Sequence, residues 1–230
     1  MEQLPLPVRL RADALFASYW AGAVNGEPVA ALRARQPDPV WLWGAPGTGK
    51  THLLQAACVD AGTSAAAYFP LGGEARLPPE ALAGFASRGL VCVDDVDRVA
   101  GDPAWERMLF ALWNEAAELH TRLVFAASAP PAGLPWQLAD WRSRAAACVV
   151  YQLRELDDAG RIEALRLRAL QRGLQLPAET ADYLLRRMPR SLSSLLAVLD
   201  DLDVAALAAQ RRLTVPFIRD ALERSARTRP

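Results

Sequence analysis

The sequence of 230 residues lacks most features of a secreted, membrane-bound or strongly DNA-binding protein. Its three cysteines are far apart in apolar stretches, which argues against a cysteine metal site and favours buried thiols in a reducing compartment. No basic N-terminal region precedes an apolar stretch, and no apolar run approaches the ~18 residues of a membrane span, so we expect a cytoplasmic protein without membrane contact. Basic and acidic residues both number 26, so no excess positive charge is present to hold DNA phosphates.

The sequence is rich in apolar residues, at 52%, and many of them occur in short runs. Such runs, bounded by turn residues, predict buried strands. The predicted strands cover residues 40–43, 65–71, 90–97, 122–128 and 147–153. Helical segments alternate with them, for example Gly49–Ala61. This alternation predicts an α/β domain over residues 11–154, with a parallel sheet covered by helices on both faces.

The pattern changes after Leu153. Apolar residues recur at helical spacing in 155–173 and again in 192–199, and Pro177 and Pro216 are placed to open further helices. Residues 155–230 are therefore predicted to form a small all-α domain of about four helices.

A phosphate-binding loop is predicted at residues 44–51, GAPGTGKT, which match G-x-x-x-x-G-K-[ST] between a predicted strand and a predicted helix. Glycines let backbone N–H groups surround phosphate oxygens, and the helix N-terminus adds positive potential. We expect Lys50 to reach the outer phosphates and Thr51 to hold Mg²⁺. A chance glycine-rich turn is the alternative, which the flanking elements disfavour. The predicted nucleotide-binding residues are Gly44, Ala45, Pro46, Gly47, Thr48, Gly49, Lys50 and Thr51.

Polar residues follow two of the predicted strands. Asp94 ends an apolar run and is predicted to bind Mg²⁺ through water, while Asp95 is placed to orient an attacking water. Asp97 is expected to be a surface or helix-cap residue. Ser128 follows the next strand, where it either touches the γ-phosphate or is only a turn residue before prolines.

Two arginines, Arg142 and Arg144, precede the last predicted strand. One interpretation is that both are solvated surface charges. The other is an arginine finger, which stabilises transition-state charge on a neighbouring subunit's triphosphate. The residues alone leave both interpretations open.

Taken together, these features resemble an AAA+ domain with its helical lid. Within that class the sequence is similar to the DnaA replication initiator and, over nearly the whole chain, to the regulatory Hda family. The matching stretches include LPLPVRLRADALFASYW, PVWLWGAPGTGKTHLLQAAC, LVCVDDVDRVAGDPAWE, ALRLRALQRGLQLP and AQRRLTVPFIRDAL. The resemblance adds His52, in the helix after the loop, and Arg190, in the lid, to the expected nucleotide-binding residues.

The resemblance also explains residues 1–10, an apolar segment broken by prolines. It implies an extended peptide that docks into a groove of the DNA polymerase III β sliding clamp, with the prolines reducing the entropy lost on docking. The implied contact residues are Gln3, Leu4, Leu6, Pro7 and Val8. The alternative is an N-terminal strand packed on its own domain.

The resemblance implies a negative regulator of replication initiation. With ADP or ATP bound, it would sit on the DNA-loaded clamp and promote hydrolysis of DnaA-bound ATP through Arg144. DNA would be reached only through the clamp, because the initiator's helix-turn-helix domain has no counterpart in the sequence. Homo-oligomerisation stays open.

Three departures from the wider class, Ser128, Ser193 and Asp95, imply weak or no ATPase activity of the chain's own. The alternatives are a stand-alone P-loop ATPase, such as a helicase loader, and a DNA-binding relative of the initiator.

Overall fold

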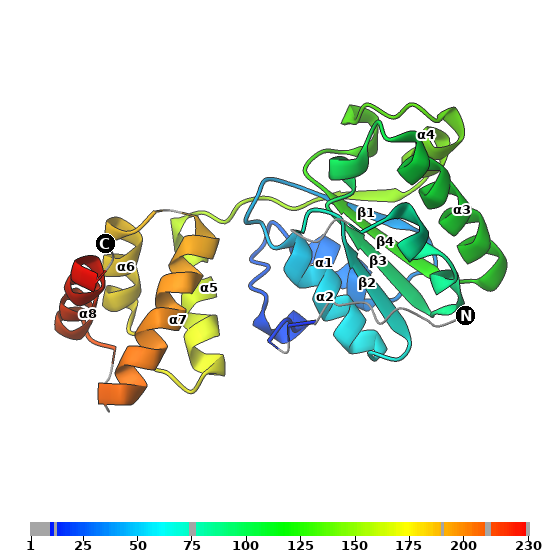
Figure 1. The fold of residues 1–230 in the computed structure, drawn as a ribbon. Coiled ribbons are helices and arrows are strands. Elements are labelled where there is room, and N and C mark those ends of the chain that lie inside the picture. The colour runs from blue at the N-terminus through cyan, green and yellow to red at the C-terminus, as the bar shows by residue number, and fades with distance from the viewer. Residues whose placement is uncertain (1–9, 12, 74–76, 190, 210–212, 229–230) are drawn as a thin grey trace. The chain divides into compact units, whose positions relative to one another are not determined.

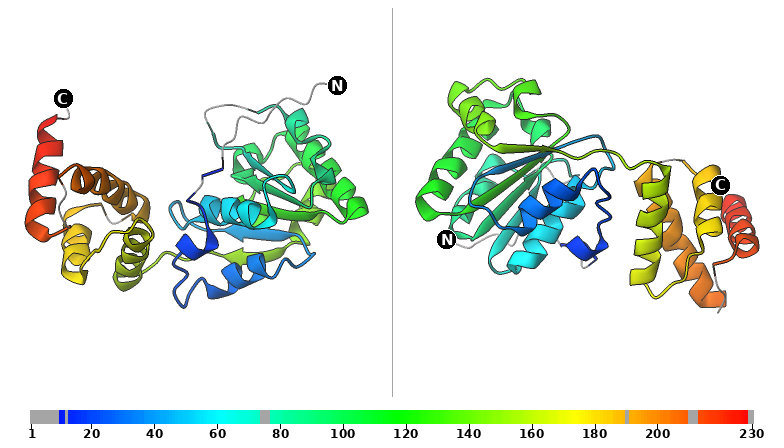
Figure 2. Two further views of the ribbon diagram at one scale, coloured as in Figure 1. Left: turned by 90° about the horizontal axis from the view of Figure 1, so that it is seen from below. Right: turned by 180° about the vertical axis from the view of Figure 1, so that it is seen from behind.

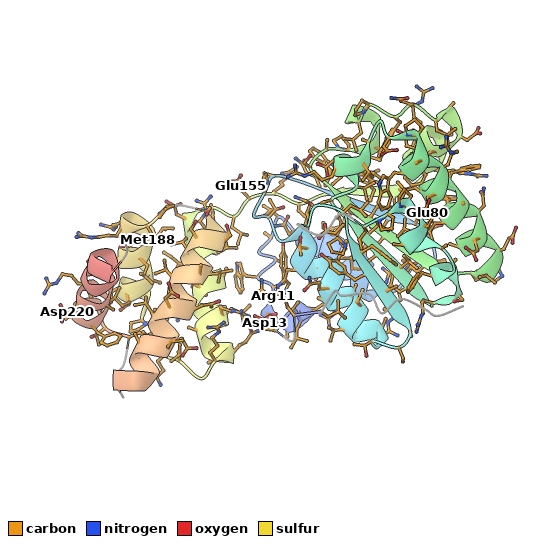
Figure 3. All side chains as sticks on the ribbon, in the orientation of Figure 1. Arg11, Asp13, Glu80, Glu155, Met188 and Asp220 are labelled. Carbon is orange, nitrogen blue, oxygen red and sulfur yellow. The ribbon has the colours of Figure 1, made fainter. Side chains whose placement is uncertain are left out.

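The computed structural model describes residues 10–228 except 12, 74–76, 190 and 210–212, and divides into two compact units, Met1–Arg154 and Glu155–Pro230 (Figure 1). Figure 3 adds the side chains and labels Glu155, the first residue of the second unit. The predicted clamp-binding residues Gln3, Leu4, Leu6, Pro7 and Val8, and the lid residue Arg190, lie outside the described residues.

The first unit contains a five-stranded sheet in which each strand pairs in parallel with its neighbours, in the order β2-β3-β4-β1-β5. The strands are β1 (Val40–Trp43), β2 (Ala66–Pro70), β3 (Leu90–Asp94), β4 (Arg122–Ala127) and β5 (Val149–Gln152). The predicted parallel sheet is therefore confirmed. In this order β4 lies between β3, which ends in Asp94, and β1, which precedes the phosphate loop. The sequence did not predict this position of β4.

Helices cover both faces of this sheet (Figures 1 and 2). Helices α1 (Gly26–Arg33) and α2 (Lys50–Ala61) pack on one face, and α3 (Pro103–Leu119) and α4 (Ala139–Ala146) on the other. Alternate residues of each strand serve the two faces, since successive side chains point to opposite sides. In β1, Val40 and Leu42 belong to the core beneath α1 and α2, whereas Trp41 belongs to the core beneath α3 and α4.

Helix α3 has a well-defined start. Asp102 is its N-cap and accepts hydrogen bonds from the N–H groups of Ala104 and Trp105, and Pro103 occupies the first turn, where its missing N–H costs nothing. Short 3₁₀ turns complete the described part of this unit. They are η1 (Phe16–Ser18), η2 (Pro79–Leu82), η3 (Phe85–Ser87), η4 (Val96–Val99) and η5 (Pro131–Gly133).

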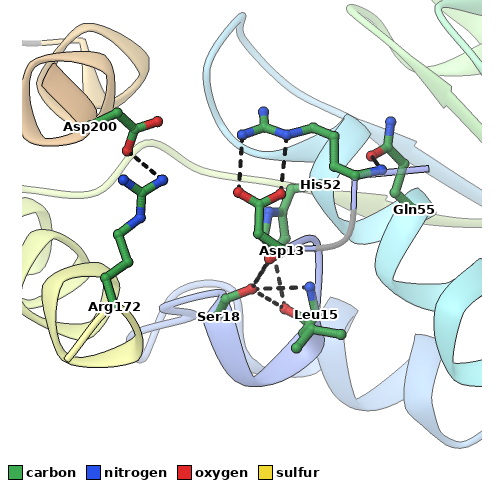
Figure 4. A network of polar contacts seen from close by, with 8 residues as sticks. Asp13, Leu15, Ser18, His52, Gln55, Arg172 and Asp200 are labelled. Atoms are coloured by element: carbon green, nitrogen blue, oxygen red, sulfur yellow. Dashed lines mark hydrogen bonds and ion pairs between the residues drawn. The ribbon is translucent and has the colours of Figure 1, made fainter. Parts of the chain in front are cut away.

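The second unit is all-helical, as predicted, with α5 (Asp158–Gln171), α6 (Ala178–Arg187), α7 (Leu192–Ala209) and α8 (Val215–Thr228). Its core is separate from those of the first unit and consists mainly of leucines and alanines from all four helices. At the end of α5, Arg172 forms ion pairs with Asp200 and Asp203 of α7, and Figure 4 shows the one with Asp200. None of the helices, within the described residues, combines the length and apolar character needed to cross a membrane.

Candidate functional site

The predicted phosphate loop, residues 44–51, follows the end of β1, and its last two residues, Lys50 and Thr51, begin α2. Gly47 and Gly49 have φ of 84° and 93°, in the left-handed region that favours glycine. Gly44 needs glycine for a different reason, because a Cβ at that position would lie 2.4 Å from the carbonyl oxygen of Leu153. The backbone N–H of Gly44 also donates to the carbonyl of Ala127, at 3.3 Å, which ties the loop to the end of β4.

Lys50 is buried at the start of α2, and its ammonium group turns back onto the loop. Its Nζ donates to the carbonyls of Gly44 at 2.7 Å and Ala45 at 3.2 Å. Two neutral carbonyls satisfy its hydrogen bonds without neutralising its charge. The site therefore combines a buried cation with a helix N-terminus, the combination that suits an anionic phosphate group.

The two acids at the end of β3 have different environments. Asp94 is buried, and its carboxylate accepts hydrogen bonds from the Tyr68 hydroxyl at 2.8 Å and from the Asp95 N–H at 3.0 Å. Asp95 has a φ of 56°, and its carboxylate lies so close to Gly72 that a Cβ there would be 2.3 Å from Oδ2. Partial burial, with the neighbouring Asp94 and Asp97, raises the pKa of Asp95, and Lys50 opposes that rise.

Ser128 follows β4 and is held by Asp97 of η4. The Asp97 carboxylate accepts from the Ser128 hydroxyl at 2.7 Å and from its backbone N–H at 3.0 Å. Asp97 is partly exposed, and beyond the expected surface or cap position it holds the residue that follows the neighbouring strand. The contact joins positions 31 residues apart, so local sequence patterns carried no indication of it.

The sheet order brings the predicted residues to one edge. Asp94 ends β3, Ser128 follows β4, and Lys50 begins the helix after β1. The three strands are neighbours, because β4 lies between β3 and β1. The carboxyl ends of these strands share one edge of the sheet, where ligands bind in open α/β folds. Thr51 is exposed in the first turn of α2 beside Lys50.

The segment before α1 packs against the loop and α2, which the sequence did not predict. Figure 4 shows its contacts with His52 and Gln55 of α2. Tyr19 donates its hydroxyl to the Thr48 carbonyl at 2.9 Å, and its ring covers Gly49. The His52 ring contacts Ser18 and the Leu15 carbonyl, at 3.1 and 2.9 Å from Nε2. The imidazole of His52 thus lies against residues 15–18; its predicted contact with nucleotide stays a prediction.

Arg142 and Arg144 lie on α4, and both are exposed. Trp141 and Ala145, one turn apart, are buried in the core beneath α3 and α4. Helix α4 therefore holds one face on the core and presents the two arginines to solvent on its flanks.

The C-terminal end of α4 lies at the edge of the sheet opposite the phosphate loop. Two residues after α4 the chain enters β5, whose first residue, Val149, is aligned with Val40 at the start of β1. The loop follows the other end of β1. Arg144 is thus placed away from this chain's own loop.

Ser193 is exposed in the first turn of α7, within hydrogen-bond distance of Ser191. Because residue 190 lies outside the described residues, the predicted role of Arg190 stays a prediction.

The residues present fit a nucleotide with Mg²⁺. The loop N–H groups and Lys50 suit the phosphates, and Asp94 with Thr51 offers the oxygen ligands that Mg²⁺ takes beside phosphate oxygens.

Comparisons with known proteins agree with this geometry. The family model described as Hda, lid domain, matches residues 158–222. Domain III of the Thermotoga maritima replication initiation protein DnaA has the same fold, with a TM-score of 0.76 and 20% identity over 94% of this chain and 98% of that chain. Residues 158–222 therefore match the Hda lid family, and the chain has the AAA+ fold of DnaA domain III.

Two further structures extend the similarity in fold. AMPPCP-bound DnaA from Aquifex aeolicus matches with a TM-score of 0.66 and 22% identity, over 83% of this chain and 66% of that chain. The Thermotoga maritima RuvB Holliday junction branch migration motor matches with a TM-score of 0.65 and 17% identity, over 90% of this chain and 72% of that chain. The fold is therefore the one shared by these AAA+ proteins, an α/β domain followed by a helical lid.

Proposed function

We propose that this AAA+ protein is a negative regulator of replication initiation. It binds an adenine nucleotide with Mg²⁺ at the loop 44–51, docks on the DNA-loaded β sliding clamp through residues 3–8, and stimulates hydrolysis of DnaA-bound ATP. Arg144 is the residue that acts in trans. ADP is the nucleotide we expect it to hold.

The single observation that carries the proposal is the position of Arg144, on the exposed flank of α4 and at the edge opposite this chain's own phosphate loop. An arginine so placed is available to a neighbouring molecule and not to the chain's own triphosphate. A guanidinium supplied in trans accelerates phosphoryl transfer by about 10³- to 10⁵-fold in other systems. The Hda-type lid supports DnaA as the neighbour.

Nucleotide binding is supported independently. The buried Lys50, the positive-φ glycines of the loop and the buried Asp94 at the end of β3 support it, and AMPPCP-bound DnaA shares the fold. The partly buried Asp95, whose pKa is raised, is the residue available to orient a water, so weak turnover of the chain's own nucleotide is compatible with the site.

The first test compares Arg144→Ala with Arg142→Ala, its neighbour on the same exposed helix. We measure hydrolysis of DnaA-bound ATP with loaded clamp, and nucleotide affinity and clamp binding separately. Arg144→Ala is expected to lose nearly all stimulation while keeping both binding activities, and Arg142→Ala to keep most of it. Full stimulation by Arg144→Ala would remove this residue from the mechanism.

The second candidate function is a stand-alone ATPase such as a helicase loader, which the intact loop and Asp94 favour. ATP turnover by the purified chain, without DnaA or clamp, separates the two. Substantial turnover, abolished by Asp94→Asn, would favour the ATPase.

A further inference from the structure

Glu106 is a fully buried charged residue on α3, with 0% of its surface exposed, and it lies outside the phosphate site. Its carboxylate accepts from the backbone N–H of Gly101 at 2.8 Å, of Gln137 at 2.9 Å and of Leu138 at 2.6 Å. Burying an acid costs free energy unless its oxygens are well satisfied, and several backbone N–H donors supply that satisfaction.

These three donors come from two separate segments. Gly101 lies in the turn after η4, the element whose Asp97 holds Ser128. Gln137 and Leu138 lead directly into α4, and Leu138 is its N-cap. A further hydrogen bond joins the same segments, since the Gln137 side chain donates Nε2 to the Gly101 carbonyl at 2.8 Å.

The start of α4 depends on this carboxylate. No side chain caps the helix at Leu138, so Glu106 receives N–H groups at and just before its N-terminus and places negative charge beside the positive end of the helix. The rest of the helix is held by Trp141, which packs edge-on against Trp113, Trp136 and Phe125. The helix is therefore held by the Glu106 carboxylate at its start and by the buried Trp141 and Ala145 along its length.

We propose that Glu106 is a positioning residue for the arginine helix: by holding the residues that begin α4, it fixes the direction in which Arg144 projects. The inference rests on the proposed function of Arg144. It goes further because a buried acid on another helix, 38 positions away in the sequence, sets the direction of the Arg144 side chain. Because it also accepts the N–H of Gly101, the same carboxylate connects the turn after η4 to the start of α4.

The Glu106 carboxylate only accepts hydrogen bonds, so the variant that tests its role replaces an acceptor with a donor. Glu106→Gln keeps the shape and volume of the side chain but replaces one acceptor oxygen with an NH₂ donor. That donor must face a backbone N–H group, because donors surround both carboxylate oxygens. A displacement of about 1 Å in a catalytic group, such as an arginine supplied by another molecule, lowers the reaction rate by about 100-fold.

The experiment uses the full chain with Glu106→Gln, Arg144→Ala and the control Glu115→Gln, an exposed acid on the same helix. Hydrogen exchange is measured over residues 139–146 and, as an internal reference, over 50–61. Nucleotide affinity, the maximal stimulation of DnaA-bound ATP hydrolysis and the concentration for half-maximal stimulation are measured for each variant. Thermal unfolding confirms that each variant is folded.

For Glu106→Gln we expect exchange to rise by about tenfold or more in 139–146 but not in 50–61, because one buried hydrogen bond is lost at α4. Maximal stimulation should fall about 10- to 100-fold, with unchanged nucleotide affinity and half-maximal concentration. Glu115→Gln should match the unmodified chain.

The outcomes separate the two proposals. If Arg144→Ala keeps full stimulation, the proposed function is wrong, whatever the exchange data show. If Arg144→Ala loses stimulation but Glu106→Gln keeps it, the positioning role is overturned and the function stands. Faster exchange in both 139–146 and 50–61 would also overturn it, since Glu106 would then support the whole core.

Discussion

In the proposed function we expect nucleotide binding to depend most on Lys50, a buried cation whose Nζ donates to the carbonyls of Gly44 and Ala45. A charge-assisted hydrogen bond to phosphate contributes roughly 1.5–3 kcal/mol, which corresponds to about 10- to 100-fold in affinity. Lys50→Ala is expected to weaken ADP and ATP binding by that factor, measured by calorimetry. Arg107→Ala, which removes an exposed cation of α3, is the control, and equal affinity in both variants would contradict the phosphate-loop assignment.

Tyr19, which is hydrogen-bonded to the phosphate loop, is expected to make the stability of the fold depend on pH in the alkaline range. Burial raises the pKa of Tyr19 from 10.0 to about 12. The raised folded-state pKa means that its stabilising contribution is complete below pH 10 and is lost as pH rises toward 12, because the unfolded chain ionises first.

Tyr19→Phe is therefore expected to make the loss of stability between pH 10 and 12 less steep, and to cost about 1 kcal/mol at pH 7 through the lost bond to Thr48. Chemical unfolding at a series of pH values measures both effects. An unchanged slope in the variant would show that other groups control the alkaline transition.

At the scale of elements, the sequence predicted what depends on local pattern. The strands lie in the short apolar runs that predicted them, and the loop and its following helix also lie where the residues indicate. Burial on both faces of a strand and the conformation of glycine are encoded in neighbouring residues. Helices α3 and α4 were not predicted, although Asp102 followed by Pro103 is a recognisable helix start. The Asp97–Ser128 and Glu106–Leu138 contacts were not predictable, since each joins segments more than 30 residues apart.

Asn25 joins two elements of the first unit in a way that allows a further prediction. Its side chain is buried, donates to the carbonyl of Arg154 at 2.9 Å and accepts from the N–H of Arg154 at 2.8 Å. The start of α1 is thereby attached to the chain just after β5.

Asn25→Ala removes both bonds and leaves two backbone groups without partners. Arg154 is exposed, so water can reach these groups, and at about 0.5–1.5 kcal/mol per hydrogen bond we expect the free energy of unfolding to fall by roughly 1–3 kcal/mol. Arg33→Ala, an exposed change on α1, should alter it by less than about 0.5 kcal/mol. A denaturation midpoint for Asn25→Ala equal to that of Arg33→Ala would show that the pairing contributes nothing.

At the scale of the whole molecule, the proposed function combines parts of different kinds: a peptide for the clamp, a site for nucleotide and an arginine for DnaA. If they act separately, each can be removed without loss of the others. Replacing Gln3 and Leu4 by Ala is expected to abolish capture by immobilised clamp while nucleotide affinity and thermal unfolding stay unchanged. Replacing Glu2 by Ala is the control, and clamp capture that survives the Gln3 and Leu4 change would place the docking surface elsewhere.

If Arg144 acts in trans as proposed, its placement at the edge of the sheet opposite the phosphate loop gives each molecule a side that supplies the arginine and a side that receives one. A contact between two unlike surfaces is head-to-tail, so it does not close into a two-fold symmetric dimer. Within a head-to-tail row of subunits, only the terminal molecule whose nucleotide faces outward is open to a visiting guanidinium. A regulator of this design would therefore dismantle an assembled row from one end, one hydrolysis event at a time.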